Sequence, residues 1–151
     1  MSRAFVKEID DAPPPAMMAN RVTPRGARLI EEAIAALEQD VARAQEGEAA
    51  PSLLRDLRYW RARRASMQIV TPNPAPTAVG FGVQVTIRRG SLTSDITIVG
   101  EDEADPARGL IAWTAPLARA LDGAENGETV VFDRGGHSEE ITAIAIRASA
   151  S

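Results

Sequence analysis

The sequence predicts an α+β fold, in which an N-terminal antiparallel helical hairpin precedes a small, mostly antiparallel β domain with one short helix. Three observations predict it. Apolar residues follow helical spacing over residues 30–67, apolar and polar residues alternate over residues 83–147, and prolines at positions 72, 74 and 76 lie between the two patterns. Because proline stops a helix and favours extended chain, these prolines separate a helical half from a β half.

The chain start is predicted to be a disordered tail over residues 1–20. Asp10-Asp11-Ala12-Pro13-Pro14-Pro15 cannot bury a core, and its prolines favour polyproline II. The segments after the tail are a helical hairpin over residues 21–70, a proline-rich linker over residues 71–78 and a β domain over residues 79–148.

The first helix is predicted to begin at Thr23, a good N-cap, with Pro24 in the first helical position. Its apolar seam consists of Ile30, Ile34, Leu37, Val41 and Ala44, and a second seam consists of Leu53, Leu57, Trp60 and Met67. Two narrow seams joined by a short Gly- and Pro-containing turn favour two helices folded back on each other. The 22 residues from Pro24 to Gln45 give an arm of about 33 Å.

The β half alternates apolar and polar residues with period two. Short strands are predicted within residues 83–88, 95–98, 109–113, 129–133 and 140–147. One or two helical turns are expected over residues 116–121, stopped by Asp122-Gly123, and Gly135-Gly136 is expected to connect the last two strands tightly.

The amino-acid composition excludes most kinds of catalytic site. The chain has no Cys, one His and one Lys. Disulfides, thiolate zinc sites and a Cys nucleophile are therefore excluded, and so is a site with several His ligands. His137 lies in a polar turn, where a solvated imidazole is expected. We predict a protein that is not an enzyme and has no catalytic residue, metal, cofactor or small-molecule substrate of its own.

No run of about 18 apolar residues is present, so no membrane span is predicted. The first eight residues carry charges where a signal peptide needs an apolar core. We therefore expect a cytoplasmic protein with no membrane partner.

Charge is distributed unevenly. Residues 1–72 carry 11 basic and 10 acidic side chains, and the rest carry 6 and 11. The acidic run Glu101-Asp102-Glu103-Ala104-Asp105-Pro106 is interpreted as a solvated loop, or as a site for a cation or a basic partner surface. The arginines of the second helix either balance acidic residues on the first helix or contact nucleic acid or an acidic protein groove.

Glu46 and Glu48 are predicted to lie at the hairpin tip. Carboxylates on a protruding arm are able to enter another protein's active centre and help to hold a magnesium ion there. The alternative is a loop tip that is simply solvated.

Several segments resemble the GreA/GreB family of bacterial transcription elongation factors. They are Met1 to Glu8, Arg21-Val22-Thr23-Pro24-Arg25-Gly26, the acidic run after Val99-Gly100, Ala115-Pro116-Leu117-Ala118-Arg119-Ala120-Leu121, Gly127 to Val131, and Gly135-Gly136. The resemblance covers about residues 21–148 and is stronger in the β half than in the hairpin.

The resemblance implies an N-terminal antiparallel coiled coil and an FKBP-like β domain that docks on RNA polymerase at the rim of its secondary channel. The loop Trp113-Thr114-Ala115-Pro116 would make this contact, and Asp102 and Asp105 are expected to belong to the same polymerase-binding surface. The arm would then enter the channel, where an indirect contact with nascent RNA is one of the expectations. In cleavage-stimulating members an Asp-x-x-Glu pair at the tip helps to position a magnesium ion of the polymerase.

This sequence departs from the family at the tip. It has no Asp-x-x-Glu there, and the hairpin is shorter by several turns on each helix than the resemblance implies for the cleavage factors. If about 14 residues per helix are missing, the tip falls short by about 20 Å. Metal coordination at about 2 Å does not tolerate that gap. The expected function is therefore modulation of elongation without efficient transcript cleavage.

Two other functions stay open. The first is an Rnk-like regulator with a target beyond polymerase. The second is a prolyl isomerase, with Phe81, Trp113 and Phe132 as the aromatic residues of the β half.

Overall fold

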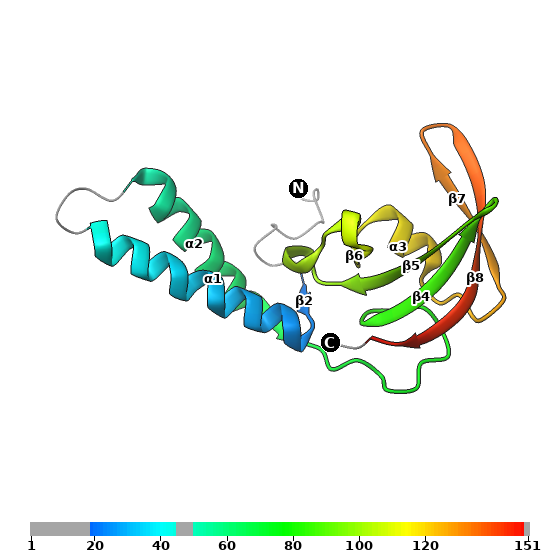
Figure 1. Cartoon of the computed structure of the whole chain (residues 1–151), viewed down its shortest axis with the longest axis horizontal. Helices are drawn as coiled ribbons and strands as arrows, with labels where there is room; N and C mark the ends of the chain where they lie inside the picture. The colour runs from blue at the N-terminus through cyan, green and yellow to red at the C-terminus, as the bar shows by residue number, and fades with distance from the viewer. Residues whose placement is uncertain (1–18, 45–49, 150–151) are drawn as a thin grey trace, which may run out of the picture.

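The structure is a computed structural model, and it describes residues 19–44 and 50–149. A helical hairpin projects from one end of a curled β sheet (Figure 1). Four of the five strands of this sheet pair in an antiparallel way, so the predicted α+β class is confirmed.

The hairpin consists of α1 (Pro24–Arg43) and α2 (Pro51–Ser66), which lie side by side in opposite directions (Figure 1). The hydroxyl of Thr23 caps α1 as expected by accepting the N–H of Gly26 at 3.0 Å. The buried apolar residues of this part are Val22, Ala27, Ile30, Ile34 and Leu57, with Leu37, Val41, Trp60 and Met67 packed against them. The two predicted seams therefore meet each other.

Two expectations at the base of the hairpin are corrected. Met67 does not continue the second helix but begins strand β3 (Met67–Ile69), which pairs in parallel with β2 (Asn20–Val22). Asn20 is not part of a tail but is buried, because its amide donates to the carbonyl of Arg63 at 3.0 Å and to Ser66 Oγ at 3.2 Å. Residues 1–18 of the predicted tail lie outside the described residues.

The β half is one sheet in the strand order β6-β5-β4-β8-β7. Its elements are β4 (Val83–Arg89), β5 (Leu92–Val99), β6 (Leu110–Ala112), α3 (Pro116–Leu121), β7 (Thr129–Arg134) and β8 (His137–Ala148). The helix has the bounds that the sequence predicts. Gly135 and Gly136 both have positive φ, which the tight turn between β7 and β8 requires.

The sheet and α3 enclose a second apolar cluster. Its buried members are Val79, Val85, Ile87, Ile96, Ile98, Ala118, Leu121, Ala124, Phe132, Ile141 and Ala143. This cluster shares no member with the hairpin cluster. The contact between arm and sheet must therefore rest largely on other interactions.

Among the described residues, no helix is long and apolar enough to cross a membrane.

Close backbone packing at Gly100 predicts that Gly100→Ala destabilises the protein. An added Cβ would lie 2.5 Å from the carbonyl oxygen of Arg21, and neither backbone can yield without moving β2 away from the sheet. We expect a loss of about 1–3 kcal/mol of unfolding free energy in urea denaturation. Gly80→Ala is the matched control, because a Cβ there meets no atom within 4 Å and Gly80 has no positive φ. Equal stability of the two variants would contradict this prediction.

Candidate functional site

The acidic run lies where the hairpin meets the sheet. Directly after β5, Gly100 leads into the short 3₁₀ helix η3 (Glu101–Glu103), and a second one, η4 (Pro106–Arg108), comes next. The tight turn of η3 directs its three carboxylates toward the hairpin base and the loop after β6. We call Glu101, Asp102 and Glu103 the acidic joint.

Glu103 holds the start of α1. Its side chain is buried, and its two oxygens accept the Thr23 hydroxyl at 2.6 Å and Arg25 Nη1 at 2.8 Å. The Thr23 hydroxyl thus donates to the sheet half while it accepts the Gly26 N–H of its own helix. Because a buried carboxylate is costly without partners, this arrangement fixes where α1 begins relative to η3.

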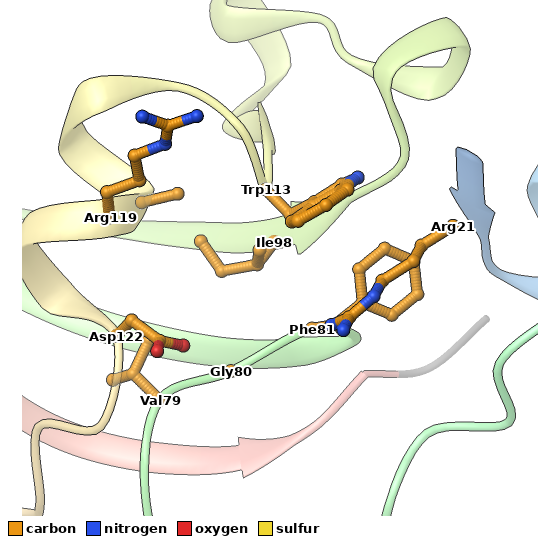
Figure 2. A pocket seen from close by; sticks show the side chains of 9 residues that line it. Arg21, Val79, Gly80, Phe81, Ile98, Trp113, Arg119 and Asp122 are labelled. Carbon is orange, nitrogen blue, oxygen red and sulfur yellow. The ribbon is translucent and has the colours of Figure 1, made fainter. Parts of the chain in front are cut away.

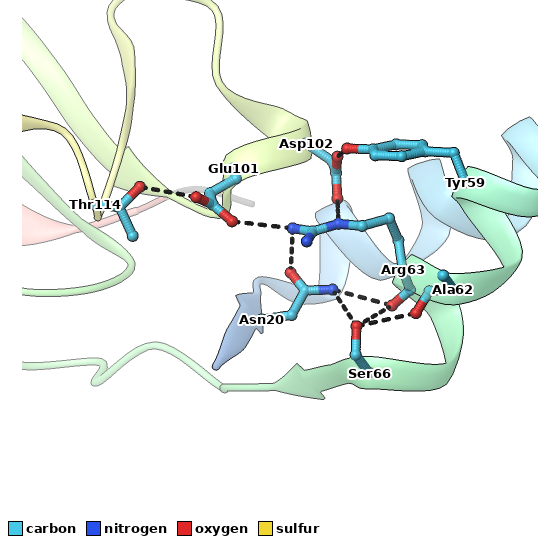
Figure 3. Close-up of polar contacts among 8 residues, drawn as sticks. All are labelled: Asn20, Tyr59, Ala62, Arg63, Ser66, Glu101, Asp102 and Thr114. Carbon is cyan, nitrogen blue, oxygen red and sulfur yellow. Dashed lines mark hydrogen bonds and ion pairs between the residues drawn. The ribbon is translucent and has the colours of Figure 1, made fainter. Parts of the chain in front are cut away.

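Asp102 holds α2. Arg63 Nε donates to Asp102 Oδ2 at 2.6 Å, and the hydroxyl of Tyr59 donates to Asp102 Oδ1 (Figure 3). Tyr59 and Arg63 are four residues apart, so they project from the same face of the helix. The side chains of Asp102 and Arg63 are only 9% and 18% exposed, which shields this ion pair from water.

The network continues from Arg63 in two directions (Figure 3). Arg63 Nη2 donates to Asn20 Oδ1 at 2.7 Å and to Glu101 Oε1 at 3.2 Å. The other oxygen of Glu101 accepts the hydroxyl of Thr114 at 3.1 Å. A continuous chain of polar contacts therefore links α2 to the loop that precedes α3.

The acidic run is thus not a solvated loop, and its basic partner is the chain's own hairpin. Both oxygens of Asp102 are engaged within the chain, and a polymerase contact of Asp102 stays a prediction. In the described part of the chain, no group of three or more His, Asp or Glu side chains is placed to hold a metal ion.

Asp105 lies outside this network. Its backbone starts β6 through two hydrogen bonds with Leu110, at 2.8 and 3.1 Å, and its side chain is half-buried. A polymerase contact of Asp105 stays a prediction.

The loop Trp113-Thr114-Ala115-Pro116 connects β6 to α3. Trp113 is half-buried beneath the guanidinium of Arg21, which lies 4.8 Å from its ring centroid. Ala115 has extended backbone at the N-cap position, and Pro116 occupies the first turn of α3 with its side chain exposed. Thr114 donates its hydroxyl to Glu101 and so ties the loop to the acidic joint.

This loop forms one wall of a groove of about 510 Å³ between α3 and the end of β7. We call it the docking groove. Its lining is mostly apolar and consists of Ala104, Pro106, Ile111, Ala112, Ala115, Pro116, Leu117 and Phe132, with Arg89, Asp133, Arg134 and Gly135 at its margin. A groove of this kind fits an apolar face of another protein.

The predicted tip residues Glu46 and Glu48 lie outside the described residues. The arginines of α2 are described, and two of them balance α1: Arg61 pairs with Glu38 at 2.9 Å, and Arg64 pairs with Glu31 at 3.3 Å. This agrees with the interpretation of helix two as a face that balances the acidic residues of its partner.

Sequence reasoning missed Tyr59, Arg63 and Arg25 as partners of the acidic joint. The signal available was the four-residue spacing of Tyr59 and Arg63, which places a donor pair on one helix face. Nothing local in the sequence connects that face to residues some forty positions later.

A family model described as "Transcription elongation factor, GreA/GreB, C-term" matches residues 73–148, half of the chain. The chain is 44% identical to the transcription elongation factor GreA of Pseudomonas putida over 64 residues, which are 41% of this chain and 40% of the relative. It is 35% identical to GreB of Neisseria meningitidis serogroup A over 95 residues, 61% of this chain and 58% of the relative. The chain thus spans about half the length of these curated relatives.

Matches among solved structures include the GreA factor homologue Gfh1 of Thermus thermophilus. Its sequence identity is 14% and its TM-score 0.42, with 87% of this chain and 100% of that chain covered. The GreA/GreB factor of Nitrosomonas europaea is 20% identical with a TM-score of 0.42, covering 85% and 98%.

The shielded ion pair predicts that Asp102→Asn destabilises the protein. The amide removes the carboxylate that lies 2.6 Å from Arg63 Nε and leaves Glu101, at 3.2 Å, as the remaining counter-charge of this arginine. We expect a loss of about 2–3 kcal/mol of unfolding free energy. The matched control is Glu38→Gln, which breaks a pair whose side chains are about half exposed, 51% for Arg61 and 49% for Glu38. That variant should lose less than about 1 kcal/mol in the same urea titration. Equal losses would show that the acidic joint is no stronger than a surface pair.

The contacts of Tyr59 predict that the stability of the folded protein depends on pH in the alkaline range. Burial, the hydrogen bond to Asp102 and the charge of Asp102 raise the pKa of Tyr59 from 10.0 to about 12. The folded state therefore holds the phenol proton more tightly than the unfolded state. This contribution to stability is fully present below a pH of about 10 and is lost as the pH rises to about 12.

Because the chain has one Tyr, tyrosinate absorbance reports this group alone. We expect a titration midpoint near 12 in the folded protein and a lower one in Asp102→Asn. Tyr59→Phe should abolish the signal. An ordinary midpoint of about 10 in the folded protein would refute the contact.

Proposed function

Because the chain belongs to the GreA/GreB family of transcription elongation factors, we propose that it binds RNA polymerase at the secondary channel and modulates elongation without efficient transcript cleavage. The family match and the names of the relatives support polymerase as the partner. A polymerase partner also agrees with the cytoplasmic location expected from the sequence. In this proposal any magnesium ion belongs to the polymerase active centre, and the chain contributes no catalytic residue.

The docking groove supports the binding part of the proposal. It lies beside Trp113-Thr114-Ala115-Pro116, the loop expected to meet polymerase, and its apolar lining is able to receive the apolar face of a partner helix. Pro116 is exposed at its rim. Thr114 is half-buried and engaged with Glu101, so its role would be to hold the loop in shape.

The observation that carries the proposal is the length of the arm. The 20 residues of α1 span about 30 Å and the 16 residues of α2 about 24 Å. The acidic joint fixes both helices at their base. The hairpin therefore cannot shift along the sheet to project further from it. If cleavage-stimulating arms are longer by about 20 Å, this arm occupies the channel without delivering carboxylates to a metal at about 2 Å.

The Rnk-like alternative is a regulator that acts by binding a target beyond polymerase. The short arm is compatible with it as well. The two proposals differ in whether polymerase is the partner, which a binding measurement with core polymerase decides.

The experiment adds the protein to stalled, backtracked elongation complexes. We expect it to bind core polymerase, to compete with a cleavage-active family member, and to leave the backtracked RNA uncut. Absence of polymerase binding would favour the Rnk-like alternative. Robust cleavage that is lost in Glu46→Ala and Glu48→Ala would refute the non-cleaving role.

A charge placed on the rim of the docking groove should weaken this binding. Pro116→Glu puts a carboxylate at the first turn of α3, a position that tolerates acidic residues, so the fold should persist. We expect polymerase affinity to fall about tenfold or more, because the carboxylate would be desolvated against an apolar partner. Pro74→Glu, at an exposed linker position, is the matched control and should bind as the parent does. Equal affinity of both variants would exclude the docking groove as the contact surface.

A further inference from the structure

A second cavity, separate from the docking groove, lies between α3 and the segment before β4 (Figure 2). Its volume is about 300 Å³, and it is lined by Arg21, Val79, Gly80, Phe81, Ile98, Trp113, Ala118, Arg119 and Asp122. We call it the Arg21 pocket. It shares no lining residue with the docking groove, although Trp113 belongs to the loop expected to meet polymerase. The test below measures ligand binding to the chain alone, so its outcome is distinguishable from that of the proposed function.

The inner wall of the Arg21 pocket is apolar. Val79, Ile98 and Ala118 are each 3% exposed, and they belong to the core of the sheet half. The rings of Phe81 and Trp113 complete the lining (Figure 2). The volume is at the lower end of ligand pockets, so the wall accommodates one small aliphatic group.

The opening of the pocket is positively charged. The guanidinium of Arg21 lies 4.8 Å from the centroid of the Trp113 ring, and Arg21 belongs to the lining of the cavity (Figure 2). An arginine held on an aromatic face keeps its in-plane N–H groups available for bidentate contact with a carboxylate. Among the described residues, neither Arg21 nor Arg119 forms an ion pair, and Asp122 is the one carboxylate in the lining.

We propose that the Arg21 pocket binds a carboxylate attached to a small aliphatic group, with the carboxylate on Arg21 and the aliphatic group on the wall formed by Val79, Ile98 and Ala118. This chemistry occurs at the C-terminus of a peptide that ends in an aliphatic residue and in a free branched-chain acid. A neutral proline ring, the ligand of an isomerase, would leave the guanidinium groups unmatched.

Trp113 provides the signal for a test on the full chain. The chain has two Trp, so a Trp60→Phe background makes fluorescence report the pocket alone. The probes are N-acetyl-leucine and its uncharged partner N-acetyl-leucinamide. We expect a saturable change with the acid at a dissociation constant of about 1 mM or below, and binding of the amide about tenfold weaker.

Arg21→Gln in the same background should remove the advantage of the acid over the amide. Arg119→Gln, on the exposed face of α3, should reduce it and serves as the second variant if Arg21→Gln fails to fold by circular dichroism. Arg55→Gln, an exposed arginine on the arm, is the matched control and should bind as the background does.

Equal binding of acid and amide, or no saturable change with either, would overturn the proposal. So would an acid preference that persists in both Arg21→Gln and Arg119→Gln. Isocaproate distinguishes the two sources: weaker binding than N-acetyl-leucine assigns the pocket to a peptide C-terminus, and equal binding assigns it to a free acid.

Discussion

Three carboxylates on one short 3₁₀ turn hold the arm on the sheet. The hairpin and the sheet each have their own apolar cluster, and the two clusters share no residue. Glu103 fixes the start of α1, and Asp102 fixes the end of α2 through Arg63 and Tyr59. Two apolar surfaces in contact are able to shift past each other at little cost in free energy. Hydrogen bonds between charged groups are directional, and breaking them leaves unpaired groups that are costly to bury. The acidic joint therefore sets the direction of the arm as well as its attachment.

The same joint connects the arm to the surface proposed to meet polymerase. Glu101 accepts hydrogen bonds from Arg63 on α2 and from Thr114 in the loop beside the docking groove. A partner that displaces this loop would also change the contacts of α2, because only the side chain of Glu101 lies between Thr114 and Arg63. The loop beside the docking groove and the base of the arm are thus physically linked through Glu101.

Local chemistry makes much of the fold predictable. Thr23-Pro24 starts α1, Pro116 and Asp122-Gly123 bound α3, and Gly135-Gly136 places the last turn, because each of these signals acts on neighbouring backbone. The helical prediction for Met67 is wrong because its spacing fits the second seam while its backbone pairs with β2, more than forty residues earlier in the chain. The tail prediction for Asn20 is wrong for the same reason, since its amide is bound by the end of α2.

The sequence by itself determined two helices, a sheet of five strands and the break between them. Periodicity and caps are local properties that fix such features. Only the tertiary structure decided what the acidic run does. A carboxylate is able to bind water, a metal ion or an arginine. Which of these it binds depends on the groups that the folded chain brings within about 3 Å. Here that group is Arg63, so Asp102 holds the chain's own arm in place.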